Sequence, residues 1–140
     1  MKPGLIGIVI VAHGGLAQEY LAALEHVVGP LKGVRAISVG PDDKLETRQD
    51  QIATASDEVN QGQGVILVTD LFGSTPSNLA MKASMRHGMD MLYGANMPML
   101  VQLAKSRHLP RTDAINAAVD AGHRYLDARH APAPSSVVAC

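Results

Sequence analysis

The sequence predicts a single α/β domain built on an open, mainly parallel sheet with helices on both faces. Two runs rich in β-branched residues, 5–11 and 65–70, lack polar alternation, which is typical of strands buried on both faces of a parallel sheet. Strand and helix patterns alternate four times, an order that requires right-handed crossovers. The 140 residues suit one domain, expected over residues 1–130, with a disordered tail over 131–140.

The first half of the chain is expected to form two strands and two helices. Apolar side chains at helical spacing follow the first buried run and stop at Gly29 and Pro30, so a helix fills this interval. A shorter run alternates enough to suggest an edge strand, and a turn that offers an N-cap then opens a polar helix. The expected elements are a strand over 5–11, a helix over 16–28, a strand over 34–39 and a helix over 44–60.

The second half follows the same alternation. The second buried run ends on Asp70, and the helix that follows is closed by Gly88. Pro98 opens a short helix, since proline is tolerated in the first turn; Thr112 caps the next helix and Gly122 ends it. The expected elements are a strand over 65–70, a helix over 77–87, a strand over 89–93, helices over 98–107 and 112–121, and a last, polar strand over 123–129 that would form an antiparallel edge.

The composition excludes several classes of function. A net charge of −1 with scattered acids and bases gives no electrostatic footprint for nucleic acid or an anionic membrane. The single cysteine, Cys140, cannot form an internal disulfide, and no apolar run reaches the roughly 18 residues of a membrane span, so a cytoplasmic protein without membrane insertion is expected. No metal or cofactor is expected, because ligand-spaced histidines, a Walker loop and a dinucleotide fingerprint are lacking.

Polar residues stand where the predicted strands end. Parallel strands bring their carboxyl ends to one edge of the sheet, so His13, Gly40, Asp70 and Asn96 should lie along the same rim. The two buried strands are expected to be neighbours, which puts His13 and Asp70 within hydrogen-bonding reach. A carboxylate on one ring nitrogen fixes the histidine tautomer and leaves the other nitrogen free to act as a nucleophile.

The loop after Asp70 predicts an anion site. Gly73, Ser74 and Thr75 precede a helix, so backbone N–H groups, the helix dipole and two hydroxyls point at the same rim. Together with the histidine and the carboxylate, these residues indicate phosphoryl transfer through a phosphohistidine. Ser74, Thr75 and Pro76 are also an ordinary helix start, and the hydroxyl can serve both purposes.

Three separated motifs carry a family resemblance: GIVIVAHGG, VILVTDLFGSTPSN and YGANMPML, within a match from Gly7 to about Arg129. They resemble the enzyme IIA domain of the mannose family of the bacterial phosphoenolpyruvate-dependent sugar phosphotransferase system. The resemblance implies strand order 2-1-3-4. It also implies that His13 accepts a phosphoryl group from the histidine-containing phosphocarrier protein and passes it to a IIB partner. Asp70 would be the orienting carboxylate and Thr75 a phosphate-contacting hydroxyl.

The resemblance also implies a homodimer, because family members are commonly dimers, sometimes through an exchanged C-terminal strand at the position of residues 123–129. The family usually has Gly-Gly-Ser-Pro where this chain has Gly73-Ser74-Thr75-Pro76, so a hydroxyl persists while Ser74 adds a side chain. The chain shows no IIB domain, so the acceptor is expected on a separate protein.

Three alternative functions are open. The protein could be a regulatory IIA protein whose phosphorylation state is the message, or the phosphotransfer subunit of a dihydroxyacetone kinase. A hydrolase using Ser74 or Thr75 is the third, and it lacks the G-x-S-x-G elbow such enzymes need. The residues do not name a sugar, since in this family the sugar contacts belong to other subunits.

Overall fold

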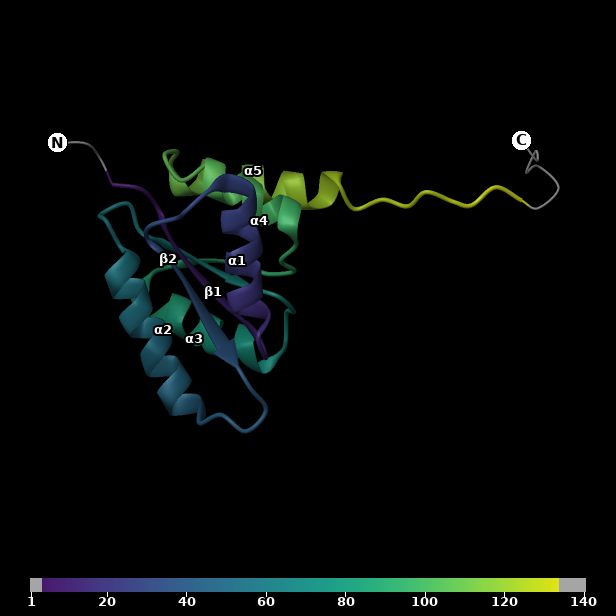
Figure 1. Ribbon diagram of the computed structural model, residues 1–140. Helices are drawn as coiled ribbons and strands as arrows, with labels where there is room; N and C mark the ends of the chain where they lie inside the picture. Colours follow the sequence, from purple (N-terminus) through teal and green to yellow (C-terminus); the bar gives the residue numbers. More distant parts are fainter. Residues whose placement is uncertain (1–3, 134–140) are drawn as a thin grey trace.

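A four-stranded parallel sheet with helices on both faces forms the domain (Figure 1), which confirms the predicted class. The computed structural model describes residues 4–133. The strand order is β2-β1-β3-β4, as the resemblance implied. The strands are β1 (Gly7–His13), β2 (Val34–Val39), β3 (Val65–Thr69) and β4 (Asp90–Leu92). The helices are α1 (Leu16–Val28), α2 (Leu45–Val59), α3 (Thr75–His87), α4 (Met97–Lys105) and α5 (Arg111–Arg124).

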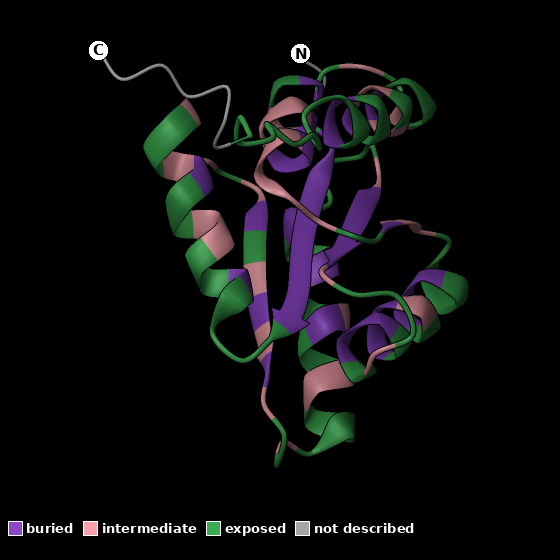
Figure 2. Ribbon diagram, turned by 90° about the vertical axis from the view of Figure 1, so that its right-hand side faces the viewer, coloured by how far each residue is buried: buried purple, intermediate pink, exposed green. Residues whose placement is uncertain are grey.

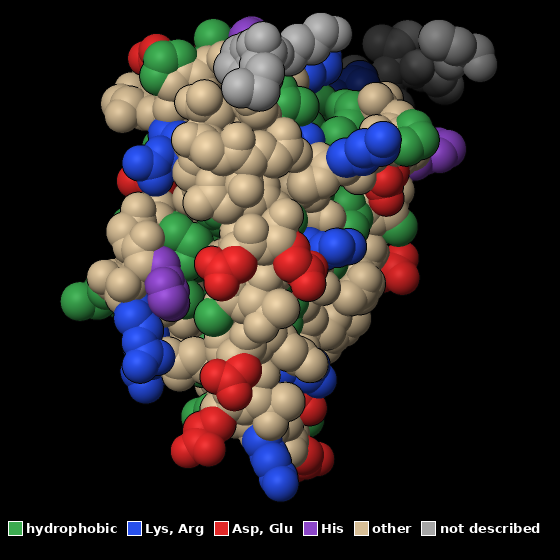
Figure 3. Space-filling view, turned by 90° about the vertical axis from the view of Figure 1, so that its left-hand side faces the viewer, with side chains coloured by type: hydrophobic (Ala, Val, Ile, Leu, Met, Phe, Trp, Pro, Cys, Tyr) green, Lys and Arg blue, Asp and Glu red, His purple; other side chains and the backbone are tan. Residues whose placement is uncertain are grey.

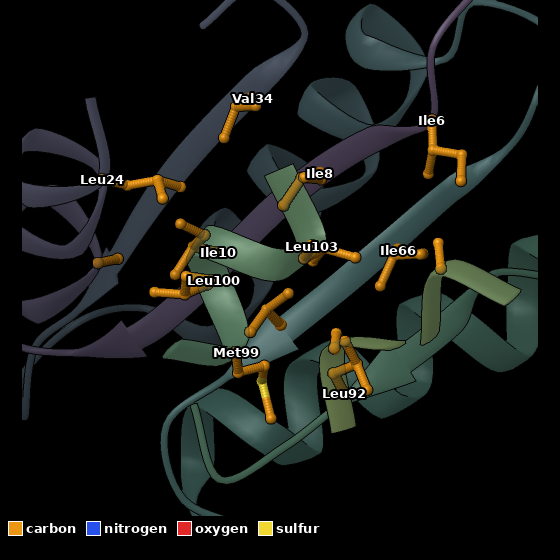
Figure 4. Close-up of a cluster of buried hydrophobic side chains, with 14 of the residues drawn as sticks. Ile6, Ile8, Ile10, Leu24, Val34, Ile66, Leu92, Met99, Leu100 and Leu103 are labelled. Carbon is orange, nitrogen blue, oxygen red and sulfur yellow. The ribbon is translucent and has the colours of Figure 1, made fainter. Parts of the chain in front are cut away.

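The central strand β1 divides the core into two layers. Its even-numbered side chains, such as Ile8 and Ile10, pack against α1, α4 and α5, and Figure 4 shows this cluster. Val9 and Val11 face the other way, toward α2 and α3. Because β1 is buried on both sides (Figure 2), every position except the last is apolar or glycine. The alternation places the His13 side chain on the sheet face that α2 and α3 cover.

The register of the sheet brings the predicted site residues together. β1 pairs with β3 through Val11 and Thr69, and with β2 through His13 and Val39. His13 therefore ends β1, while Asp70 directly follows the neighbouring strand β3. This is the arrangement expected at the carboxyl edge of an open parallel sheet.

The C-terminal strand predicted over 123–129 is wrong. α5 continues to Arg124, and residues 125–133 have no regular structure and extend away from the sheet (Figure 1). Gly122, predicted to end the helix, lies inside it, and a Cβ there would come 3.3 Å from the Cβ of Met99. The glycine thus permits close packing of α5 on α4. Most of the tail predicted as disordered, including Cys140, lies outside the described residues.

Helix starts also differ from the prediction in an informative way. α3 begins at Thr75 instead of residue 77, because the side chain of Ser74 caps it. α5 begins at Arg111 after Pro110, and Thr112, predicted to cap it, lies within the helix. No helix within residues 4–133 is long and apolar enough to cross a membrane.

Candidate functional site

His13 and Asp70 form a hydrogen-bonded pair at the carboxyl edge of the sheet. The ring Nδ1 of His13 lies 2.7 Å from Oδ2 of Asp70, and the backbone N–H of His13 donates to the same oxygen at 3.2 Å. The other oxygen, Oδ1, accepts the N–H of Leu71 at 3.0 Å. The carboxylate side chain is 11% exposed and the imidazole 49% exposed, so Asp70 is enclosed while the ring remains accessible.

The protonation of this pair follows from its contacts. Burial raises the pKa of Asp70, but the hydrogen bonds from the ring and backbone of His13, together with the charge that the ring carries when it is protonated, outweigh burial, so the pKa lies below its ordinary value. Asp70 is therefore a carboxylate, and Nδ1 of His13 carries the shared proton. The lone pair of Nε2 is left at the accessible end of the ring.

The ring of His13 lines an open cleft of about 500 Å³ between the end of β2, the start of α2 and the start of α3. Gly14 allows the chain to turn at this point, with φ of +53°, and its N–H donates to the carbonyl of Val39 at 2.9 Å. The lining residues are His13, Gly14, Val39, Gly40, Pro41, Asp43, Leu45, Thr75 and Pro76. The cleft is large enough to admit a phosphoryl group.

The residues of the predicted anion-binding loop have two different roles. Thr75 lines the cleft with His13. Ser74 is the N-cap of α3: its hydroxyl donates to the carbonyl of Leu71 at 2.6 Å and accepts the N–H of Ser77 at 3.4 Å. Gly73, with φ of +84°, forms the turn that precedes this cap. The structure therefore brings Thr75 to the histidine, while Gly73 and Ser74 set the position of the helix start.

Asp43 is a cleft residue that the sequence analysis missed. Its Oδ2 accepts the N–H of Gly40 at 2.6 Å and Nε of Arg48 at 2.8 Å. The hydrogen bonds from Arg48 and then Gly40 hold the pKa of Asp43 below its ordinary value. The turn was expected to cap the following helix, but Lys44 is the N-cap of α2 and caps it with no side-chain hydrogen bond. The carboxylate of Asp43 stabilises the turn itself.

Tyr20 of α1 supports the rim behind Asp70. Its hydroxyl donates to the carbonyl of Ala95 at 3.1 Å, and the N–H of Ala95 donates to the carbonyl of Thr69 at 3.1 Å. Burial, and next the negative charge of Asp70, raise the pKa of Tyr20. Tyr20 lies in the helix predicted over 16–28, and no local pattern in the sequence indicates its link to Ala95.

Two further rim features involve the loop after β4. Asn96, expected on the rim, accepts the N–H of Met99 at 2.9 Å as the cap of α4 and donates to the carbonyl of Gly122 at 3.1 Å. Phe72 and Tyr93 form an exposed aromatic pair with ring centroids 4.6 Å apart. The loop after β4 is thereby connected to the loop after Asp70.

Basic side chains do not gather into a patch on the face of the molecule shown in Figure 3. On the face shown in Figure 3, where α2 lies, acidic and basic side chains are interspersed. Within residues 4–133, no group of three or more His, Cys, Asp or Glu side chains could hold a metal ion.

Comparison with known proteins gives one consistent result. The family model EIIA-man, described as the PTS system fructose IIA component, matches residues 7–120. The Escherichia coli K12 protein YadI, named as a phosphotransferase enzyme IIA component, is 31% identical over 104 residues, 74% of this chain and 71% of its own length. The mannose-specific EIIAB component of the same organism is 28% identical over 94% of this chain, which spans 44% of that relative.

Solved structures agree with the sequence matches. The mannose/sorbose-specific IIA subunit of Enterococcus faecalis superimposes with a TM-score of 0.79 at 26% identity, covering 95% of this chain and 98% of that one. The phosphotransferase component EIIA of Streptococcus agalactiae shares the fold, with a TM-score of 0.81 at 23% identity over 89% of this chain and 97% of that one.

Proposed function

The chain belongs to the family of IIA components of the sugar phosphotransferase system, and from this premise we propose that it carries a phosphoryl group on Nε2 of His13. The observation behind the proposal is the 2.7 Å contact between Nδ1 of His13 and the enclosed carboxylate of Asp70. It leaves one ring nitrogen without a proton at the mouth of an open cleft. A nucleophile in that position can be reached by the phosphorylated residue of another protein.

In the proposed reaction, the lone pair of Nε2 attacks the phosphorus of a phosphohistidine on the phosphocarrier protein. The P–N bond of the donor breaks, and its electron pair returns to the donor's ring nitrogen. The proton on Nδ1 of His13 stays in place, so the His13 ring becomes cationic, and Asp70 stabilises that charge. The same steps in reverse order pass the group to a histidine or another nucleophile of a IIB partner.

The phosphoryl oxygens need donors on the cleft wall. Thr75 supplies a hydroxyl there, and its backbone N–H is the donor left at the start of α3, because Pro76 has no N–H and the N–H of Ser77 already donates to Ser74. Gly73 and Ser74 contribute through the turn that fixes this helix start against the cleft. Thr75 is therefore the proposed direct contact, with Gly73 and Ser74 as the residues that shape the anion site.

We further propose that the IIA domain spans residues 1–130 and acts in the cytoplasm as a homodimer. Within the described chain β4 pairs only with β3, and its outer side borders an apolar groove of about 490 Å³ between β4 and α5. Tyr93 and Leu126, 53% and 78% exposed, line this groove. Light scattering should give the mass of a dimer, and Leu126→Glu should shift it to monomer while Val27→Glu, also at an exposed apolar position, should not. A monomeric wild type would refute the dimer.

The phosphohistidine is tested by intact mass. The purified chain is incubated with phosphoenolpyruvate, the general phosphotransferase enzyme and the phosphocarrier protein. Wild type should gain the mass of one phosphoryl group, which acid should remove, and His13→Ala should gain none. His108→Ala, which removes an exposed histidine in the turn after α4, should be modified like wild type. An unmodified wild type in the presence of competent donor would refute the proposal.

A further inference from the structure

None of the side chains that line the cleft around His13 is a lysine or an arginine. Of the residues that line it, only His13 and Asp43 are ionisable. Lys44 is exposed beside the cleft without lining it. A phosphoryl group on His13 would therefore be held by a hydroxyl and by the dipole of α3, with an ionised carboxylate nearby.

The nearest arginine does not fill this role. Arg48 donates from Nε to Asp43 at 2.8 Å and from Nη1 to Gln51 at 2.6 Å. It lines the groove on the other side, between β2 and α2. Its charge is thus already paired with Oδ2 of Asp43, and its side chain does not line the cleft.

Asp43 keeps one oxygen available. Both of its hydrogen bonds, from Gly40 and Arg48, end on Oδ2. No described residue donates a hydrogen bond to Oδ1. The side chain is 26% exposed, so a group entering the cleft from solvent can reach it.

We propose that Asp43 receives a cationic side chain of the partner protein, an arginine or lysine presented beside the partner's own phosphorylated or accepting residue. This inference rests on the proposed function of His13. The incoming cation would contact Oδ1 of Asp43 and the phosphoryl oxygens together, and so supply the positive charge that this chain does not place in the cleft. Asp43 is then a specificity-determining residue: it favours transfer between proteins over transfer from small anionic phosphoryl donors, which bring no cation.

The test compares two donors on one set of variants. The donors are the phosphorylated phosphocarrier protein and phosphoramidate, a small reagent that phosphorylates histidine and has no cationic side chain. The variant is Asp43→Asn, whose amide oxygen can still accept the N–H of Gly40. The matched control is Asp42→Asn, at the exposed neighbouring carboxylate.

Asp43→Asn should lower the second-order rate constant with the protein donor by about tenfold or more, the scale of a lost interfacial charge pair. Its rate with phosphoramidate should stay equal to wild type or rise, and Asp42→Asn should match wild type with both donors. Added salt should slow the wild type with the protein donor more than it slows Asp43→Asn. Equal losses with both donors would show a structural role, and no loss would show that Asp43 binds no cation; either result overturns the inference.

The variant Arg48→Gln tests whether the positive charge beside the phosphoryl group comes from this chain or from the partner protein. If Arg48 turned into the cleft to neutralise the phosphoryl group, this variant would be slow with both donors, and the inference would be overturned. We expect its phosphoramidate rate to be unchanged. A wild type that neither donor phosphorylates on His13 would refute the proposed function itself, whereas a phosphorylated wild type with an unselective Asp43→Asn refutes this inference alone. If phosphoramidate phosphorylates the wild type and the phosphocarrier protein does not, the phosphocarrier protein is not the donor, and the inference is refuted.

Discussion

Asp70→Asn isolates the electrostatic part of the proposed mechanism, because it removes the charge and keeps the shape of the side chain. Two unit charges 4 Å apart interact by about 1 kcal/mol in water and about 4 kcal/mol at an effective dielectric constant of 20. The carboxylate is 11% exposed and the ring 49%, which places the pair between these limits. Because each 1.4 kcal/mol is a factor of ten, the variant should accept the phosphoryl group about 5 to 700 times more slowly.

The assay follows phosphorylation of His13 by rapid quenching and intact mass, with circular dichroism as the check on folding. The control is Asp90→Asn, which removes a half-exposed carboxylate paired with Arg111 at 3.3 Å, at the start of β4 and so at the opposite edge of the sheet. The control should react like wild type. A folded Asp70→Asn protein that reacts within threefold of wild type would show that the carboxylate does not stabilise the charged ring.

The remaining predictions concern pH, the phosphate contact and the fold. The lowered pKa of Asp70 means that its stabilising contribution is present above the ordinary aspartate pKa and is lost only as the pH falls through the lowered value. In a carbon-13 NMR titration of wild type, the side-chain carboxyl of Asp70 should therefore titrate below the ordinary aspartate value; a titration at or above that value would contradict the hydrogen-bonded pair. Thr75→Val should slow phosphorylation about tenfold or more, and Thr75→Ser should not. Equal rates for the two variants would show that the hydroxyl does not contact the phosphoryl group. Gly7→Ala should destabilise the fold by more than about 2 kcal/mol in urea unfolding, since its Cβ would meet the carbonyl of Val59 at 2.4 Å, whereas Gly15→Ala, with nothing within 4 Å, should be nearly neutral.

The sequence was most informative about the centre of the sheet. The buried runs around Ile8 and Leu67 are rich in β-branched residues and favour strands covered on both faces, and parallel strands bring their carboxyl ends to one edge. These two facts place His13 and Asp70 on a common rim without coordinates. Their adjacency needs the strand order as well, which the motifs implied through the family and the structure confirms.

Features that depend on tertiary contacts could not be found in this way. Gly122 looks like a helix stop in the sequence, and only its packing against Met99 shows why a glycine stands inside α5. Asp42 and Asp43 are equivalent in the sequence, and the hydrogen bond to Gly40 decides which one lines the cleft. The link from Tyr20 to Ala95 joins residues 75 positions apart and leaves no local pattern.

A carrier must hold its phosphoryl group firmly enough to receive it and weakly enough to release it. A lysine or arginine fixed in the cleft would stabilise the phosphorylated state and slow the second transfer, because only interactions stronger in the transition state than in the ground state accelerate a step. In this cleft the ionised group near His13 other than Asp70 is the carboxylate of Asp43. On the proposed mechanism, Asp70 stabilises the cationic ring equally during attack and departure, whereas a partner's cation is present only while two proteins are in contact. The direction of transfer would then be set by the partners, as a carrier between a donor and an acceptor requires.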